Sequence, residues 1–335
     1  MYIDNVNIMQ YNYTIINKAM THRKIMKEVN KMKKILATLL ALILVCASVL
    51  TVVSCAPDED AKLYAAYNKI IKQYEYDDEN APVLKVAMSP DFAPMEFVDT
   101  SKTGDDKYVG FDVILAKYLA KELGMKLQIV PMSFDACMAA AQTGTVDLAI
   151  SGFSWTADRA ENFLISDYYI AGENESDQIL ITTKENAGKL TNAEALAGMK
   201  IGAQGGSLQE LLVKEQLPDN EILLYSGLNE AVEALVTGKI AALAVAKGNG
   251  EAFISANEDK LDFAGFNFEV EEKYKNNVIL LNKNDAELLT KVNAALAKAM
   301  DAKVYDSWYE ACQILSGIKT IDELGYDDQG NKIEE

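Results

Sequence analysis

Histidine and arginine are almost absent from this sequence. Its 335 residues include one histidine, His22, and two arginines, Arg23 and Arg159. Histidine is the side chain that most often transfers protons near neutral pH and binds transition metals. Because His22 lies in an N-terminal segment that we expect to be removed, we predict a protein with no histidine-based catalysis, no metal site and no cofactor.

Positive charge is scarce in general. Lys and Arg together number 32 against 50 Asp and Glu, so the net charge is −18. Residues 1–54 hold seven Lys/Arg and two Asp/Glu, a charge of +5, which leaves −23 on the remainder. A surface of this charge repels nucleic acid and anionic lipid. Nucleic acid is therefore excluded as a partner, and an anionic ligand must be captured by positive groups close to it.

One long apolar run stands near the N-terminus. A Met-Lys-Lys segment that begins at Met32 precedes apolar residues 35–53, which lead into Cys55. This order is typical of a secretory signal that ends at a lipid-modified cysteine. We predict that residues 1–31 are an extension before the true start, that residues 32–54 are a lipoprotein signal peptide, and that Cys55 carries lipid on the extracytoplasmic face of the cell membrane. The run is also long enough for an uncleaved membrane anchor.

The segments on either side of the expected folded part are polar. Residues 55–82 are acidic and contain several tyrosines, so we predict a tether, in part helical, and residues 325–335 are predicted to be a frayed polar tail. Two cysteines remain between them, Cys137 and Cys312. An extracytoplasmic compartment permits a disulfide, and two buried free thiols are the other interpretation.

Short apolar runs alternate with amphipathic helical patterns from residue 83 onward, as in α/β proteins with parallel sheets. Strands are expected at residues 84–88, 126–130, 146–151, 199–204, 221–225, 240–246 and 278–281, and helices at residues 111–123, 134–142, 207–216, 228–237, 285–300 and 306–315.

The strand–helix–strand–helix–strand order occurs twice, which predicts two similar Rossmann-like lobes. Lobe 1 is predicted to comprise residues 83–172 plus 277–324, and lobe 2 residues 177–272, since a last strand and two helices follow the second unit. The chain then crosses between the lobes near residues 171–176 and 272–277. Paired crossings form a two-strand hinge that allows closure around a ligand.

Arg159 is the residue best suited to hold an anion. All other basic residues after position 54 are lysines. A guanidinium group grips a carboxylate through two parallel hydrogen bonds, whereas an ammonium group offers a flexible point charge. Arg159 follows an apolar strand at the start of a short helix, so we predict that it anchors a ligand carboxylate. A surface ion pair or a helix-end charge is the alternative.

Three loops follow strands, where open α/β sheets bind ligands. The loop at residues 89–97 presents Phe92 between two prolines. The loop at residues 151–159 offers the Ser154 hydroxyl and helix-start amides to an anion. In the loop at residues 204–209, two glycines permit close backbone approach and a serine caps the next helix. A simple tight turn there, and ordinary core packing of the aromatic residues, are the alternatives.

The spacing of several short motifs is specific. They are Phe92-Ala93-Pro94, Gly110-Phe111-Asp112, Phe134-Asp135, Ser151-Gly152, Ser154, Thr156-Ala157-Asp158-Arg159 and Ser166-Asp167. Through them, residues 83 to 310 resemble the polar amino-acid binding proteins of ABC importers, solute-binding protein family 3 with the type II periplasmic-binding fold. The resemblance implies a substrate-binding lipoprotein that captures a small carboxylate-bearing solute, expected to be an amino acid, by lobe closure and delivers it to a membrane permease.

The resemblance also implies roles for individual residues. Arg159 clasps the α-carboxylate, helped by the amides of Ser154 and Leu208. Phe92 and Phe134 sandwich the ligand side chain, and the backbone of Gly152 helps to hold the α-ammonium group. The full set of expected ligand-binding residues is Ser89, Phe92, Phe134, Ser151, Gly152, Ser154, Arg159, Gln204, Ser207 and Leu208.

Two positions depart from the family pattern. Ala246 stands where an acidic residue usually receives the α-ammonium group, so either Asp91 or Glu251 replaces that acid, or the ligand is not an ordinary α-amino acid. Ser89 stands where some members carry an acid for a cationic side chain, which argues against lysine or arginine as the ligand.

Two other functions remain as alternatives. One is a sensor or interaction module of the same fold that has lost its ligand. The other is a dehydratase of this fold, which needs a positioned general acid. The acids in the expected cleft loops, Asp91, Glu96 and Asp158, are interpreted as structural. We therefore predict that the protein is not an enzyme.

Overall fold

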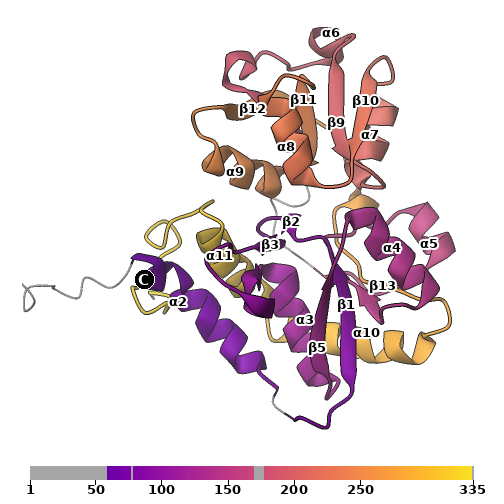
Figure 1. Ribbon diagram of the computed structural model, residues 1–335, viewed down its shortest axis with the longest axis vertical. Coiled ribbons are helices and arrows are strands. Elements are labelled where there is room, and N and C mark those ends of the chain that lie inside the picture. Colours follow the sequence, from indigo (N-terminus) through magenta and orange to yellow (C-terminus); the bar gives the residue numbers. More distant parts are fainter. Residues whose placement is uncertain (1–58, 77, 170–176, 334–335) are drawn as a thin grey trace, which may run out of the picture. The chain divides into compact units, whose positions relative to one another are not determined.

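Lobe 1 is built on a mixed five-stranded sheet. The computed structural model describes residues 59–76, 78–169 and 177–333, and the described residues from Asp60 onward form one compact unit. The strands lie in the order β5 (Lys126–Pro131), β1 (Val83–Met88), β6 (Leu148–Ala149), β13 (Leu280–Leu281) and β7 (Leu164–Ile165). Strands β5 and β6 run parallel to β1, whereas β13 is antiparallel to β6 and β7. Strands β1 and β5 lie side by side in Figure 1.

Helices cover both faces of this sheet. Helices α3 (Phe111–Glu122), α10 (Ala286–Asp301) and α11 (Tyr305–Leu315) pack on the face that carries Leu84, Val86 and Met88. Helix α4 (Phe134–Thr143) packs on the other face, against Ala87 and Ala149. Successive residues of a strand point to opposite faces, so the apolar run of β1 serves both layers.

Three short strands and several turns complete lobe 1. Strands β2 (Asp91–Phe92), β3 (Glu96–Val98) and β4 (Tyr108–Val109) form a small antiparallel sheet. Shorter helical segments of the lobe are α5 (Ala157–Asn162), η1 (Lys72–Tyr74) and η2 (Gly104–Lys107), and the longer helix α2 is described below.

Lobe 2 repeats the central arrangement. Its sheet has the order β10 (Glu221–Tyr225), β9 (Lys200–Gln204), β11 (Ala242–Ala246), β8 (Gln178–Thr183) and β12 (Leu261–Asn267), with β8 antiparallel to both of its neighbours. The unit β1-α3-β5-α4-β6 of lobe 1 corresponds to β9-α7-β10-α8-β11 here. The predicted α/β fold with two similar lobes is confirmed, except that both sheets also contain antiparallel strands.

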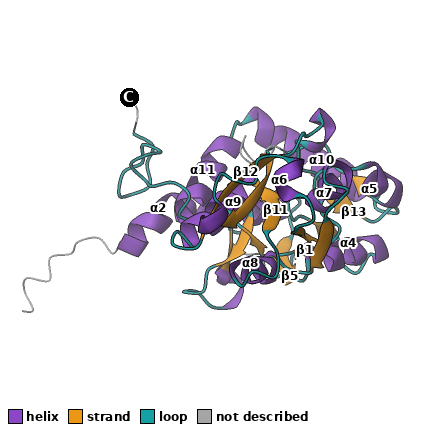
Figure 2. Ribbon diagram, turned by 90° about the horizontal axis from the view of Figure 1, so that it is seen from above, coloured by secondary structure: helices purple, strands orange, loops and turns teal. Residues whose placement is uncertain are grey.

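The helices of lobe 2 also lie on both sides of its sheet (Figure 2). Helix α7 (Leu208–Gln216) packs on Ile201, Ala203 and Ala244, whereas α8 (Leu228–Val236) and α9 (Lys247–Ala256) pack on the face of Ile179 and Val245. The shorter segments are α6 (Ala193–Leu196), η4 (Lys184–Asn186) and η5 (Glu272–Tyr274).

The chain returns to lobe 1 after lobe 2. Strand β13 inserts between β6 and β7, and helices α10 and α11 pack on the lobe 1 core. Asn277, at the end of the second crossing, forms backbone bridges with Ser154 and Tyr169 and is buried. The first crossing, near residues 171–176, lies outside the described residues, as do the predicted extension, the signal peptide and Cys55.

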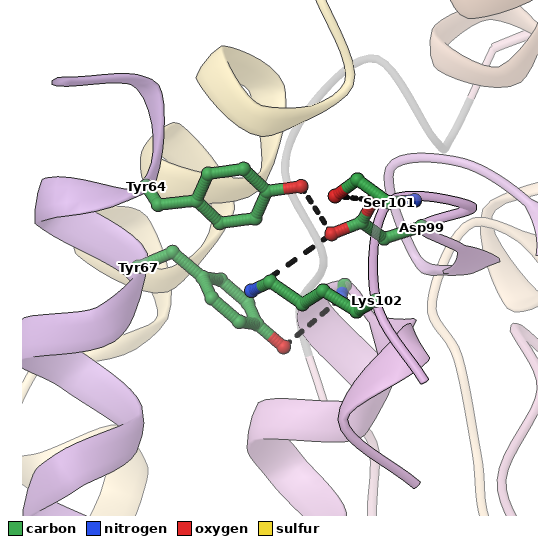
Figure 3. Close-up of polar contacts among 6 residues, drawn as sticks. Tyr64, Tyr67, Asp99, Ser101 and Lys102 are labelled. Carbon is green, nitrogen blue, oxygen red and sulfur yellow. Dashed lines mark hydrogen bonds and ion pairs between the residues drawn. The ribbon is translucent and has the colours of Figure 1, made fainter. Parts of the chain in front are cut away.

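The predicted tether is instead largely part of lobe 1. Helix α2 spans Glu59–Ile71, and Ala66 and Tyr67 are buried in the lobe 1 core. The Tyr67 hydroxyl accepts a hydrogen bond from the Gly110 N–H at 3.2 Å, while Tyr64 donates to Asp99 (Figure 3). Lys102 lies 3.8 Å above the Tyr64 ring. Tyr67 of this acidic segment is therefore a core residue, and Tyr64 packs against the core.

The predicted frayed tail also differs from the structure. Tyr326 is buried, and its hydroxyl donates to Glu310 at 2.8 Å. Lys69 of α2 donates to Asn331, and Lys62 pairs with Asp328 at 3.2 Å. The two ends of the described chain thus pack together on lobe 1. Cys137 and Cys312 are free and buried, so the interpretation as two separate thiols is confirmed.

Candidate functional site

Arg159 is buried at the start of α5. The helix begins because Thr156 Oγ1 accepts a hydrogen bond from the Arg159 N–H at 3.2 Å, a regular N-cap. Only 3% of Arg159 is exposed, and its guanidinium carbon lies 5.2 Å from the Phe153 ring and 5.6 Å from the Phe134 ring. Burial lowers the pKa of Arg159 to about 10, so the group keeps its positive charge at neutral pH.

The guanidinium group contacts both lobes. Nη1 donates to the Ser154 carbonyl oxygen of lobe 1, and Nη2 donates to the Gly206 carbonyl oxygen of lobe 2 at 2.9 Å. A guanidinium group has five N–H donors in a planar fork. These two bonds therefore leave further donors for an anion.

Arg159 lines a small cavity between the lobes. The cavity measures about 20 Å³, which is room for about one water molecule. Its lining residues are Phe92, Phe134, Ser151, Gly152, Ser154 and Arg159 from lobe 1, and Gln204, Ser207, Leu208 and Gln209 from lobe 2. The structure thus brings nine of the ten predicted site residues together. Gln209 was not predicted, because a neutral residue in the first turn of a helix gives no signal of its own.

Ser89 is the predicted residue that does not line the cavity. It is buried next to the lining residue Ser151, with 3% of its surface exposed. Its N–H donates to Ser151 Oγ at 3.0 Å, and its hydroxyl donates to Asp91 at 3.2 Å. Ser89 therefore supports the loops that carry Ser151 and Phe92.

Gly152 allows the Phe92 ring to lie against the backbone. Its φ is +56°, in the left-handed region that favours glycine. A Cβ atom at this position would lie 2.6 Å from the Phe92 ring. A side chain at residue 152 would therefore displace the aromatic wall of the cavity.

The loop before α7 places backbone groups at the cavity. Ser207 is the N-cap of α7, and its Oγ accepts a hydrogen bond from the Glu210 N–H at 3.1 Å. Glu210 reaches back to accept from the Gly206 N–H at 2.7 Å. The Ser207 hydroxyl thus serves the helix, and the Leu208 amide lies in the first helical turn, where backbone N–H groups favour an anion.

Two carboxyl groups are buried beneath the cavity floor. Asp112 accepts hydrogen bonds from the Gly152 N–H at 2.8 Å and from the Tyr169 hydroxyl at 3.1 Å. Glu96 accepts from the Ser151 hydroxyl. Glu96 Oε2 and Asp112 Oδ1 have no hydrogen-bond partner among the described residues. Burial raises the pKa of Asp112 to about 7 and the pKa of Glu96 well above its ordinary value, so the pair retains a proton near neutral pH.

Further hydrogen bonds join the lobes, one of them from the Ser255 hydroxyl to the Gly317 carbonyl oxygen at 2.9 Å and two from the β2 region. Asp91 Oδ2 of lobe 1 accepts from the Leu228 N–H at 2.7 Å, at the start of α8, whose own N-cap residue is a glycine. Asn249 of lobe 2 donates to the Ala93 carbonyl oxygen at 3.2 Å. Helix α8 of lobe 2 has no capping side chain at its own N-cap position. Asp91 of lobe 1 caps it instead.

Comparison with known proteins agrees with this geometry. Residues 84–311 match the bacterial extracellular solute-binding proteins, family 3. The chain belongs to this family. Helix α2 and the last part of the chain, which packs beside it, lie outside the matched residues.

Relatives of this solute-binding protein include amino-acid binding proteins. The arginine-binding extracellular protein ArtP of Bacillus subtilis is 29% identical over 232 residues, which cover 68% of this chain and 86% of that protein. The histidine-binding periplasmic protein of Escherichia coli is 27% identical over 228 residues, covering 67% and 84%.

Solved structures of the same kind superpose on this solute-binding protein. AbpA of Streptococcus pneumoniae, an amino acid ABC transporter substrate-binding protein bound to L-arginine, shares 32% identity with a TM-score of 0.63, covering 71% of this chain and 97% of that one. An ancestral arginine-binding protein bound to glutamine shares 30% identity with a TM-score of 0.60, covering 68% and 96%.

The departure at Ala246 is visible in the solute-binding protein's structure. Ala246 ends β11, is 1% exposed and lies opposite Gln178 in the antiparallel register of β8. Of the two acids considered as replacements, Asp91 bonds to Leu228 as described and Glu251 is half-buried on α9, and neither lines the cavity.

Lobe 2 also has a larger hollow away from this site. It measures about 760 Å³ and is lined by lobe 2 residues alone, among them the lysines Lys184, Lys200, Lys239 and Lys260. Two of these lysines pair with carboxylates, Lys184 with Asp262 and Lys200 with Glu221. Of these two hollows, the smaller one is lined by buried polar groups from both lobes. In the described part of the chain, no helix is long and apolar enough to cross a membrane.

Proposed function

We propose that this protein binds an amino acid outside the cell and delivers it to the permease of an ABC importer. The observation that carries the proposal is the buried Arg159, whose charged guanidinium group lies at a cavity between two lobes and retains unused donors. An isolated buried charge is costly. A ligand carboxylate would compensate it, with the amides of Ser154 and Leu208 beside it.

Lobe opening and closure is the proposed mechanism. A cavity of about 20 Å³ does not admit an amino acid, so the lobes must separate for the ligand to bind. The aromatic rings of Phe92 and Phe134 would then enclose the ligand side chain. Asp91 and Asn249, which already join the lobes, would stabilise the closed state. No covalent bond is made or broken in this mechanism.

Thermal unfolding tests the proposal. The chain without its predicted signal peptide, residues 56–335, is screened against all amino acids and small dicarboxylates as wild type and as Arg159→Lys. A ligand at 100 times its dissociation constant stabilises the native state by about 2.7 kcal/mol. We expect a shift with one ligand class that is largely lost in Arg159→Lys. No shift with any carboxylate, or a shift that the substitution leaves unchanged, would favour the ligand-free sensor or interaction module.

Recovery of the ligand tests the absence of catalysis. Mass spectrometry after prolonged incubation with the protein should return the bound amino acid unchanged. A product that appears in proportion to the amount of protein would favour the dehydratase alternative.

We further propose that Cys55 carries the lipid that holds the protein at the membrane. Cys55 lies outside the described residues, and the proposal rests on the sequence pattern around it. Cys55→Ala should abolish the incorporation of labelled fatty acid into the protein. Cys46→Ala, a matched change within the predicted signal peptide, should leave that incorporation unchanged. Equal behaviour of the two variants would contradict the assignment.

A further inference from the structure

The cavity offers a positive charge but no negative one. Among the described residues that line it, Arg159 is the only one that carries a charge. The others are aromatic, aliphatic, glycine, hydroxyl or amide residues. An amino acid is a zwitterion, with a carboxylate and an ammonium group one carbon apart. Arg159 compensates the carboxylate, so the ammonium group must be met by neutral groups.

Two glutamine side chains form an amide pair at the lobe 2 wall. Gln209 lines the cavity, and its Nε2 donates to Gln178 Oε1 at 2.6 Å. Gln178 is 4% exposed and lies directly opposite Ala246 across β8 and β11, so the two side chains share one face of the sheet. With its nitrogen bonded to Gln178, Gln209 has its amide oxygen available as an acceptor.

The acids close to the cavity are engaged elsewhere. Asp91 accepts from Leu228 and Ser89, and Asp112 accepts from Gly152 and Tyr169. Glu96 accepts from the Ser151 hydroxyl beneath the cavity floor. Gln204 lies beside Asp91, but its Nε2 makes no hydrogen bond of normal geometry among the described residues. None of the three acids is among the lining residues.

We infer that the Gln178–Gln209 amide pair receives the α-ammonium group of the ligand without the help of a carboxylate. This inference rests on the proposed function, because it assumes that an amino acid occupies the cavity. An amide oxygen bonds an ammonium group through a charge–dipole interaction, which is weaker than a buried ion pair. The site therefore discriminates only weakly between an amino acid and the same molecule without its α-amino group.

Matched ligand pairs test this inference by calorimetry. The pairs are L-arginine with δ-guanidinovalerate, L-glutamine with glutaramate, and L-histidine with imidazolepropionate, since related proteins bind arginine, glutamine or histidine. For a pair that binds the wild type, we expect the amino acid to bind less than 10-fold more tightly than its des-amino analogue. A preference of 10-fold or more would overturn the inference.

An isosteric carboxylate gives the second measurement. In Gln209→Glu, the Gln178 amide can turn so that its nitrogen donates to the new carboxylate. We expect this variant to raise the preference for the amino acid over its analogue at least 10-fold above the wild-type value. Gln178→Glu serves the same purpose if Gln209→Glu does not fold. An unchanged preference in the folded variant would refute the role of the pair.

A matched control separates local from general charge effects. Gln128→Glu makes the same change on the exposed part of β5 in lobe 1, and it should leave the preference at its wild-type value. An equal increase in this control would also overturn the inference. If no member of these pairs binds the wild type, the pair is formed instead from the amino acid that the thermal screen identifies. If that screen finds no amino acid either, the proposed function itself fails, and the inference fails with it. If ligands of these pairs bind but Arg159→Lys does not weaken their binding, only the assignment of Arg159 as the carboxylate anchor is wrong.

Discussion

The two lobes share one strand order but differ in the groups that they bring to the site. Both contain a parallel three-stranded centre, β5-β1-β6 in lobe 1 and β10-β9-β11 in lobe 2. Lobe 1 buries Arg159 and the carboxyl pair of Glu96 and Asp112 near the cavity. Lobe 2 contributes amides, backbone groups and helix starts. The comparison indicates that the charged part of recognition belongs to lobe 1, whereas lobe 2 closes the site with neutral groups.

The largest expected effect is on the stability of lobe 1, because only this lobe carries α2. Tyr67 is 1% exposed in its core, and removal of a large buried aromatic side chain typically costs about 3–5 kcal/mol. We expect Tyr67→Ala to lower the free energy of unfolding by this amount in chemical denaturation. Tyr168→Ala, at a residue that is 40% exposed, should cost less than about 0.5 kcal/mol. Equal effects would mean that α2 is not part of the folded lobe.

The next largest effect is on ligand affinity, and it tests whether the positive charge that holds the ligand belongs to lobe 1 or to lobe 2. Loss of a buried, hydrogen-bonded charge partner costs about 2–5 kcal/mol of binding free energy. Arg159→Ala should therefore weaken ligand binding by about 30-fold to several thousand-fold in titration calorimetry. Lys247→Ala removes a positive charge next to Ala246 that pairs loosely with Asp177 at 4.0 Å, and it should change affinity less than about threefold. A comparable loss in Lys247→Ala would show that lobe 2 also holds the anion.

The buried carboxyl pair predicts a pH dependence that originates in lobe 1. The pKa of Asp112 is raised from 3.8 to about 7, chiefly by burial, so the folded state holds a proton that the unfolded state releases. Stability therefore falls as pH rises from about 4 to about 7, by up to about 1.4 kcal/mol per pH unit for one proton. Asp112→Asn should flatten this slope in denaturation curves measured across that range.

Glu96 modifies the same slope, because burial raises its pKa as well. A slope that stays steep in Asp112→Asn would mean that Glu96 alone retains the proton.

The smallest effect concerns the contact by which lobe 1 caps a helix of lobe 2. Loss of a helix cap costs about 0.5–2 kcal/mol. Asp91→Ala should therefore shift the equilibrium toward separated lobes, which small-angle scattering would detect as a larger radius of gyration without ligand. Ligand affinity should fall by about two- to thirty-fold, in keeping with that cost. Asp105→Ala, on the exposed η2 segment, should leave both quantities unchanged. An unaltered radius in Asp91→Ala would indicate that other contacts hold the lobes together.

Sequence patterns predicted the central part of both lobes well. The expected helix at residues 134–142 is observed as Phe134–Thr143, and the expected strand at residues 221–225 is observed as Glu221–Tyr225. These elements have strong periodic patterns and are bounded by glycine or turn residues. Nine of the ten predicted site residues line one cavity, because strand ends and helix starts meet at the same edge of each sheet.

Elements with a broken or weak pattern were missed. The residues of strand β12 do not alternate regularly between buried and exposed positions. The pairing register shifts between Phe263 and Asn267, where Gly265 has a φ of +98°. Helix α2 lies in the segment that was expected to be a partly helical tether, but its role in the core was not predicted, because it depends on Tyr67 meeting Gly110, 43 positions later in the chain. Glu96 and Asp112 face each other only because the small sheet folds back onto α3. Contacts of this range leave no local pattern in the sequence.

Helix α2 changes how far the protein can reach from its proposed lipid. A flexible tether over residues 55–82 would extend to about 95 Å, whereas the four steps from Cys55 to Glu59 extend to at most about 14 Å. The lobe that α2 belongs to would therefore stay close to the bilayer surface. The volume that this lobe samples becomes much smaller as the linker becomes shorter. Its effective concentration at a membrane permease rises in the same proportion. Delivery would then depend on lateral diffusion in the membrane and on the motion of lobe 2.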